Sequence, residues 1–336
     1  MDRPVLDDAV RAGDIDELIR LVDACCDQRD WDALSALHAA CARAHETGRQ
    51  LWPAASHAAY RLALEAPARY AAAVLVEGEG RFAPGPLAEV AAQAHPWTEL
   101  APHAPPGMTA MLAAHERVVR GEDLSGDPPT GPEVLELPWR LASWEPRYAL
   151  AEYASFRGEF PSPDVPRLAT VELPAAPERG TPDDISVALL ETTRVWATES
   201  NGRADAVVVA GDATDAIAAL GPRAARVAEL DAAAALAHVA WAGASGGAHG
   251  RRRGAAAGRF SAWWLTGALA GVLDEWPPTD DARLGDAIAR CRWYWWDAAE
   301  PATGWRLQLA IEDPDAGRAW AIAAADATGP ADPGDS

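Results

Sequence analysis

The sequence predicts an α+β protein, with an N-terminal α-helical, repeat-like domain and a C-terminal α/β domain that ends in an antiparallel meander. Apolar residues recur at helical spacing through the first 120 residues, which predicts consecutive short helices. Apolar and polar residues alternate around turn signals near the C-terminus, which predicts strands. The length of 336 residues suits two domains of roughly 100–200 residues each.

The first predicted domain covers residues 1–120. Asp14 is a suitable N-cap for a helix that places Leu18 and Val22 on one face, and Pro53 suits the first turn of a later helix. Further helices are predicted over 68–76, 86–94 and 109–120. Short paired helices with brief turns are typical of an α-solenoid of the HEAT or tetratricopeptide kind. No fixed repeat period is present, so a compact irregular helical domain remains open as an alternative.

Residues 121–182 form a proline-rich connector. The prolines prevent long regular elements, but aromatic residues such as Trp139 and Trp144 are too frequent for a disordered linker. We therefore expect an ordered connector, with a short helix near 148–156 and a strand at 168–173.

The second predicted domain covers residues 183–327. Helices are expected over 185–198, 212–220, 232–242 and 260–273, and strands over 206–210, 223–230, 290–297, 305–312 and 320–322. The run from Glu312 to Gly317 is a hairpin turn signal, and so the last strands form the meander. The tail, 328–336, is expected to be disordered.

Composition excludes several function classes. The chain has 29 basic residues, all of them arginine, against 50 acidic ones, and its formal charge is −21. Such a field repels nucleic acid and anionic membrane surfaces. The absence of lysine excludes a standard P-loop ATPase, a protein kinase and any Schiff-base enzyme. The N-terminal residues lack the features of a signal peptide, and no apolar run is long enough to span a bilayer, so a cytoplasmic protein is expected.

The stretch from Gly246 to Trp264 is the strongest candidate ligand site. It combines arginines with small residues, which suits close approach to an anion. A loop that enters a helix here would present backbone N–H groups to a phosphorylated or CoA-like small molecule. The residues predicted to bind the anion are His249, Arg251, Arg252, Arg253, Gly254 and Arg259, with His249 as the nearest candidate general base.

Two observations limit this hypothesis. Arg251, Gly254 and Ala256 fit the loose pattern with which GNAT-type acetyltransferases hold a pyrophosphate, but that resemblance covers six residues. Those enzymes place a strand before the loop, whereas this sequence predicts a helix. The alternative is that the arginines form salt bridges to the many carboxylates or neutralise a subunit interface.

Trp293, Trp295 and Trp296 are a second candidate feature, within an aromatic strand. They could line an aromatic pocket, but a core that is aromatic on both faces is favoured. One face of this strand is expected to pack on the helix that holds Trp263 and Trp264.

The remaining candidates give no catalytic or metal site. Cys25, Cys26, His38 and Cys41 lie on apolar stripes without a C-x-x-C spacing, so buried cysteines are favoured over zinc ligands. No nucleophile elbow and no dinucleotide-binding fingerprint are present. The sequence predicts neither a metal nor a cofactor.

Several stretches are similar to an uncharacterised actinobacterial protein family, a domain of unknown function. They are Gln50–Pro67, Gly80–Phe82, Ala114–Leu124 and Gly250–Arg259 with the tryptophans that follow. The resemblance implies no activity. The helical layout and the lack of a complete catalytic constellation favour a protein–protein interaction scaffold or adaptor with a protein partner. The alternative is an enzyme or sensor that binds a small anionic ligand at Arg251–Arg259.

Overall fold

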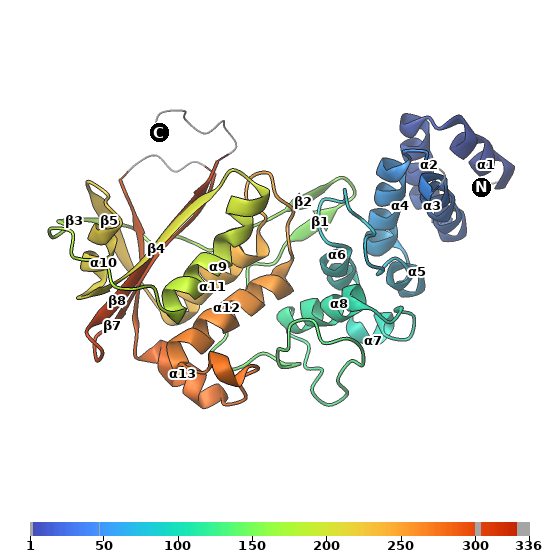
Figure 1. Cartoon of the computed structure of the whole chain (residues 1–336). Coiled ribbons are helices and arrows are strands. Elements are labelled where there is room, and N and C mark those ends of the chain that lie inside the picture. Colours follow the sequence, from blue (N-terminus) through green and yellow to red (C-terminus); the bar gives the residue numbers. More distant parts are fainter. Residues whose placement is uncertain (1–2, 47, 300–303, 328–336) are drawn as a thin grey trace. The chain divides into compact units, whose positions relative to one another are not determined.

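A computed structural model describes residues 3–46, 48–299 and 304–327 (Figure 1). The chain forms two compact units, each described here by itself. Unit 1 comprises Met1–Val134 and Leu150–Phe160, and unit 2 comprises Leu135–Ala149 and Pro161–Ser336. The predicted connector, 121–182, therefore contributes residues to both units. The predicted tail, 328–336, lies outside the described residues.

Unit 1 is built from short helices and one hairpin. Its helices are α1 (Arg3–Ala12), α2 (Ile15–Asp27), α3 (Trp31–Glu46), α4 (Trp52–Glu65), α5 (Ala68–Ala73), α6 (Leu87–Ala94), α7 (Trp97–Leu100) and α8 (Met108–Val119). The strands β1 (Glu152–Ala154) and β2 (Arg157–Glu159) pair antiparallel. Asp14 caps α2 by accepting from the backbone N–H groups of Asp16 and Glu17, as its position before the apolar stripe predicts.

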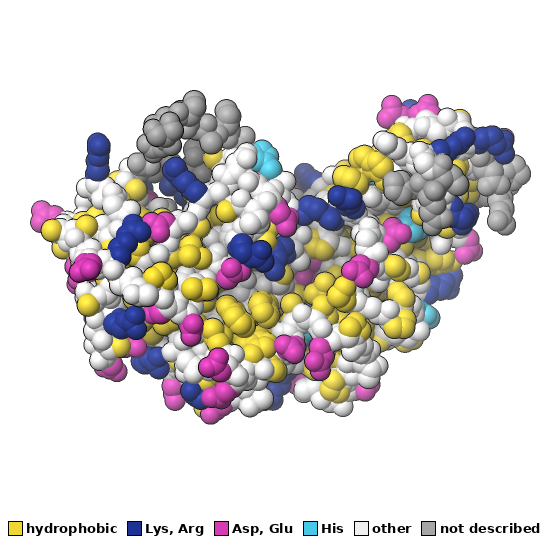
Figure 2. All heavy atoms as spheres, viewed as in Figure 1, with side chains coloured by type: hydrophobic (Ala, Val, Ile, Leu, Met, Phe, Trp, Pro, Cys, Tyr) yellow, Lys and Arg dark blue, Asp and Glu magenta, His cyan; other side chains and the backbone are white. Residues whose placement is uncertain are grey.

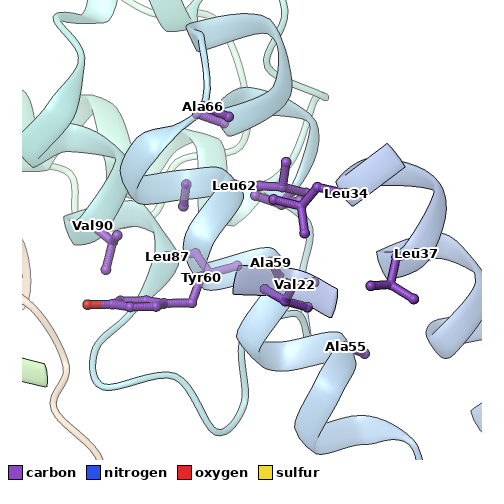
Figure 3. Close-up of a cluster of buried hydrophobic side chains, with 14 of the residues drawn as sticks. Val22, Leu34, Leu37, Ala55, Ala59, Tyr60, Leu62, Ala66, Leu87 and Val90 are labelled. Atoms are coloured by element: carbon purple, nitrogen blue, oxygen red, sulfur yellow. The ribbon is translucent and has the colours of Figure 1, made fainter. Parts of the chain in front are cut away.

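The core of unit 1 lies around α4, which contacts α2, α3 and α6 (Figure 3). Leu34 and Leu37 of α3 and Tyr60 and Leu62 of α4 are at most 1% exposed. Alanines occupy much of the contact surface of α4, which lets neighbouring helices approach closely. The expected face of α2, with Leu18 and Val22, is fully buried in this core.

The prediction of a helix near 148–156 is wrong, because this segment contains β1 and the turn that leads to β2. The backbone N–H of Tyr153 donates to Oε1 of Gln93 at 2.7 Å, and Nε2 of Gln93 donates to the Tyr153 carbonyl at 3.0 Å. The hydroxyl of Tyr60 donates to the carbonyls of Ala154 and Arg157. These long-range hydrogen bonds use backbone groups that a helix would need internally, and so they favour the extended form.

Unit 2 contains a six-stranded antiparallel sheet. Its strands are β3 (Ala169–Val171), β4 (Arg203–Ala210), β5 (Ala225–Leu230), β6 (Arg292–Asp297), β7 (Trp305–Asp313) and β8 (Arg318–Asp326), in the order β3-β5-β6-β7-β8-β4. Its helices are α9 (Asp184–Glu199), α10 (Ala213–Ala219), α11 (Ala232–Ala244), α12 (Ala255–Ala270) and α13 (Asp281–Ala289), with a 3-10 turn, η1 (Leu273–Glu275). The predicted α+β class and C-terminal meander, β6-β7-β8, are confirmed.

Helices cover both faces of this sheet. Successive side chains of a strand point to opposite faces, so a strand can pack against helices on both sides. Val207 and Val209 pack with α10, as do Ala319 and Ala321 of β8. Helices α9 and α11 contact the sheet, and α12 contacts both of them (Figure 1). The strands β6, β7 and β8 therefore carry apolar residues at consecutive positions.

The start of α12 differs from the prediction. The helix begins at Ala255, five residues before the predicted start at Phe260. Gly254 has φ of 99°, a conformation that ends the loop and favours glycine. Ala255, Ala256 and Ala257 are buried in the first turn, so these three residues of the predicted loop belong to the buried first turn of the helix.

The buried imidazole of His238 should make the stability of unit 2 dependent on pH. His238 is 2% exposed and its ring lies 4.3 Å from that of Trp295. Burial lowers its pKa from 6.5 to about 4. Between pH 6.5 and 4 the unfolded chain binds a proton that the folded chain does not, so the free energy of unfolding should fall by about 3 kcal/mol as pH drops through this window.

His238→Leu should flatten this dependence in urea-denaturation series between pH 7 and 5. A residual slope should come from His57, whose pKa is also lowered by burial. The matched control is His103→Leu, the same substitution at an exposed histidine of unit 1. An unaltered slope in His238→Leu would contradict the assignment.

Candidate functional site

The arginine stretch forms the loop between α11 and α12, and its backbone donors bond within unit 2. The N–H of Gly247 donates to Oγ of Ser245 at 3.0 Å, and the N–H of Ala248 donates to Oδ2 of Asp326 at 2.5 Å. The N–H of His249 donates to Oγ of Ser200 at 3.0 Å. These three N–H groups therefore donate to oxygens of unit 2 itself. The Asp326 carboxylate accepts from one of them, as a ligand anion was expected to do.

The glycines of this loop permit close approach of the chain to itself. Gly247 has φ of 77°, and a Cβ atom there would lie 2.2 Å from Oδ2 of Asp326. A Cβ atom on Gly246 would lie 2.2 Å from the carbonyl oxygen of Arg251. The pattern of small residues is thus explained by the path of the loop.

Arg259 is separated from the other predicted anion ligands. Its side chain is fully buried, and Nε and Nη2 bond to both carboxylate oxygens of Glu145 at 2.8 Å. Nη1 and Nη2 also donate to the carbonyls of Pro138 and Arg140. The hydroxyl of Tyr148 donates to the same carboxylate, and burial raises its pKa so that it keeps its proton. Arg259 thereby attaches the 135–149 segment to α12.

The other predicted residues lie on the loop itself. His249, Arg251 and Arg253 are exposed, Arg252 is half-buried, and Gly254 is the buried N-cap residue of α12. The structure thus keeps the three consecutive arginines at the surface of unit 2 and directs Arg259 into its interior.

The aromatic run of β6 is buried on both faces. Trp293, Trp295 and Trp296 are 1%, 7% and 2% exposed. Trp293 donates from Nε1 to the Ile288 carbonyl, and the ring of Trp295 packs against that of His238 of α11 at an interplanar angle of 34°. Trp296 packs on the opposite face in the cluster that contains α10. The helix beside Trp295 is α11, whereas Trp263 of α12 packs against Trp144 at 4.8 Å.

Cys25, Cys26 and Cys41 lie in the core of unit 1. Burial raises the pKa of Cys26 to about 12 and that of Cys41 to about 11, so both thiols stay protonated at neutral pH. His38 pairs with Glu79 at 3.1 Å. Over the described ranges, no group of three or more histidine, cysteine or acidic side chains is placed to hold a metal ion.

A further feature of unit 1, absent from the sequence predictions, is the surface around the β1–β2 hairpin. Phe156 at the hairpin tip is 67% exposed. Its ring stacks on His57 at 5.3 Å and lies 5.5 Å from the guanidinium carbon of Arg61. We call this surface the hairpin face; it consists of Asp23, His57, Arg61, Glu65, Ser155 and Phe156.

Ion pairs hold the hairpin face in place. Arg61 is 4% exposed and bonds Glu65 at 2.6 Å as well as Asp23. Nε2 of His57 lies 3.4 Å from Asp23, and the hydroxyl of Ser155 donates to Glu65 at 3.1 Å. The exposed ring of Phe156 is therefore supported by a fixed cationic and aromatic base, and little ordering is needed for it to contact a partner.

A cavity of about 530 Å³ shares Glu65 with the hairpin face. Its lining residues are Cys26, Arg29, Trp31, Glu65, Ala66, Pro67 and His95. It therefore adds a concave surface with both charges and one aromatic side chain. Hydrophobic side chains also lie between charged ones on the face of unit 1 seen in Figure 2.

The chain belongs to a family of unknown function: the model of the family described as "Family of unknown function (DUF6183)" matches residues 16–328. No curated protein and no solved structure matches the chain. No helix in the described part of the chain has the length and apolar character needed to cross a membrane.

Proposed function

We propose that this protein is a protein–protein interaction scaffold or adaptor, and that the hairpin face of unit 1 binds its protein partner. The observation that carries the proposal is the side chain of Phe156. Its large apolar ring is 67% exposed and yet packs against His57 and Arg61. Aromatic side chains at the centre of an interface supply much of the binding energy in protein complexes.

The distribution of exposed apolar side chains supports the same unit. Among the described residues, five of the seven exposed large hydrophobic side chains belong to unit 1. They are Val76, Phe82, Met108, Phe156 and Phe160. Phe82 is 53% exposed and its ring contacts Trp52 at 3.7 Å, which gives unit 1 a second supported aromatic side chain.

Binding of a phosphorylated or CoA-like ligand at the arginine stretch has less support. The N–H groups of Gly247, Ala248 and His249 donate hydrogen bonds to oxygens within unit 2. Arg259 forms a buried ion pair with Glu145. The tryptophans proposed as pocket walls are core residues.

Affinity capture with quantitative mass spectrometry tests the proposal. Full-length protein is expected to enrich a partner over bare matrix, and Phe156→Ala should weaken its binding by about 2 kcal/mol, ~30-fold. Val187→Ala is the matched control, because Val187 is an exposed apolar residue of unit 2. Equal enrichment by wild type and Phe156→Ala, or no enriched partner, would contradict the proposal.

A further inference from the structure

We propose that a cavity between α9 and α12 of unit 2 binds a small aromatic monocarboxylate. The cavity has a volume of about 280 Å³. Its lining residues are Ala188, Glu191, Thr192, Arg194, Arg253, Phe260, Ser261 and Trp264. This site is distinct from the hairpin face of unit 1 and does not depend on the function proposed for that face.

One wall of the cavity is aromatic. Phe260 and Trp264 lie one turn apart on α12, and their rings are nearly parallel, with centroids 5.8 Å apart and an interplanar angle of 18°. Trp276 supports both rings, at 5.4 Å from Phe260 and 5.0 Å from Trp264. Because Phe260 and Trp264 are only half-buried, they present a flat apolar surface on which a planar ring can stack.

Arg253 and Arg194 line the same cavity and carry the positive charge. Arg194 pairs with Glu191 at 2.7 Å. The Arg253 guanidinium has no hydrogen bond or ion pair to any described residue. Desolvation and the nearby Arg194 lower its pKa, and the Glu199 and Glu191 carboxylates only partly oppose this shift. The lining itself holds two guanidinium groups and one carboxylate, an excess of one positive charge, and Glu199 acts on Arg253 from outside the lining. An anion bound here would relieve the repulsion between the two cations.

The charge and the hydroxyl groups define the ligand and its orientation. One uncompensated positive charge matches a carboxylate, whereas a phosphate monoester carries nearly two negative charges. The hydroxyls of Thr192 and Ser261 donate to the carbonyls of Ala188 and Ala257, and so they offer only lone pairs to the cavity. The carboxylate should therefore contact the arginines and the ring should stack on the aromatic wall.

The size of the cavity limits the ligand further. Pockets for drug-sized ligands have volumes of roughly 300–1,000 Å³. At about 280 Å³ this cavity suits an acid with a single ring and is too small to enclose a CoA ester.

Calorimetric titration of the full chain with sodium benzoate tests the inference, with benzamide as a neutral probe of the same shape and inorganic phosphate as a second anion. We expect saturable benzoate binding that is at least tenfold weaker in Arg253→Met, which keeps an unbranched side chain and removes the charge. Arg283→Met is the control, because Arg283 is an exposed arginine outside the cavity, and it should bind benzoate as wild type does. Benzamide should bind at least tenfold more weakly than benzoate.

Three outcomes would overturn the inference. They are no saturable binding of benzoate, unchanged binding by Arg253→Met, and phosphate binding that equals or exceeds that of benzoate. Thermal unfolding of each variant separates these outcomes from misfolding, and should show at most a small shift because both substituted side chains are exposed. If Arg253→Met unfolds early, Trp264→Leu provides the second test and should weaken benzoate binding by removing the stacking surface.

Discussion

Arg259→Ala is expected to lower the free energy of unfolding by about 3–5 kcal/mol, because it leaves the Glu145 carboxylate buried without its counter-charge. Both side chains have 0% exposure, and the guanidinium makes hydrogen bonds to two backbone carbonyls besides the ion pair. Urea denaturation followed by circular dichroism measures the loss.

A surface ion pair provides the control for this prediction. Arg283 and Glu275 are 47% and 66% exposed and lie 3.5 Å apart, so Arg283→Ala should cost no more than about 1 kcal/mol. The double variant Arg259→Met/Glu145→Leu should recover part of the stability, since it removes both buried charges. If Arg259→Ala costs no more than Arg283→Ala, the buried pair does not stabilise the fold.

Local patterns predicted most of the regular elements. Asp14 is found as the predicted N-cap of α2, and the strands predicted around Trp305 and Trp320 are found as β7 and β8. These features depend on residues a few positions apart, whose geometry the helix and strand periods determine. A helix was predicted near 148–156, where the structure has β1, because the extended form of this segment depends on Gln93 and Tyr60, which lie far away in the sequence.

The candidate site was harder to predict for the same physical reason. The sequence identified an unusual cluster of arginines, but the partner of Arg259 is Glu145, 114 positions away. Asp326, which accepts from the N–H of Ala248, is 78 positions away. Charge and spacing along the chain cannot distinguish an arginine that can bind a ligand from one that pairs with a carboxylate distant in the sequence. Phe156 is an aromatic residue in a proline-rich segment, which predicts that the segment is ordered. The sequence does not show that its ring packs against His57 and Arg61.

Trp296→Ala is expected to destabilise the protein by about 3–5 kcal/mol, the usual cost of removing a large aromatic side chain from a packed core. Trp296 is 2% exposed and packs with Ile217 of α10 and Val207 of β4. Its indole Nε1 has no hydrogen-bond partner among the described residues. Trp296→Phe should therefore cost clearly less than the alanine variant, because it keeps an aromatic ring and breaks no hydrogen bond.

The two variants distinguish a core tryptophan from the wall of a ligand pocket. A pocket wall is partly solvated before a ligand binds, so its truncation would lower affinity and leave the free energy of unfolding nearly unchanged. A core residue shows the opposite behaviour, because the loss of packing appears without any ligand. Urea denaturation of Trp296→Ala, Trp296→Phe and the wild type measures this difference directly. A stability loss below about 1 kcal/mol for Trp296→Ala would favour the pocket hypothesis, because a fully packed core cannot lose an indole at so small a cost.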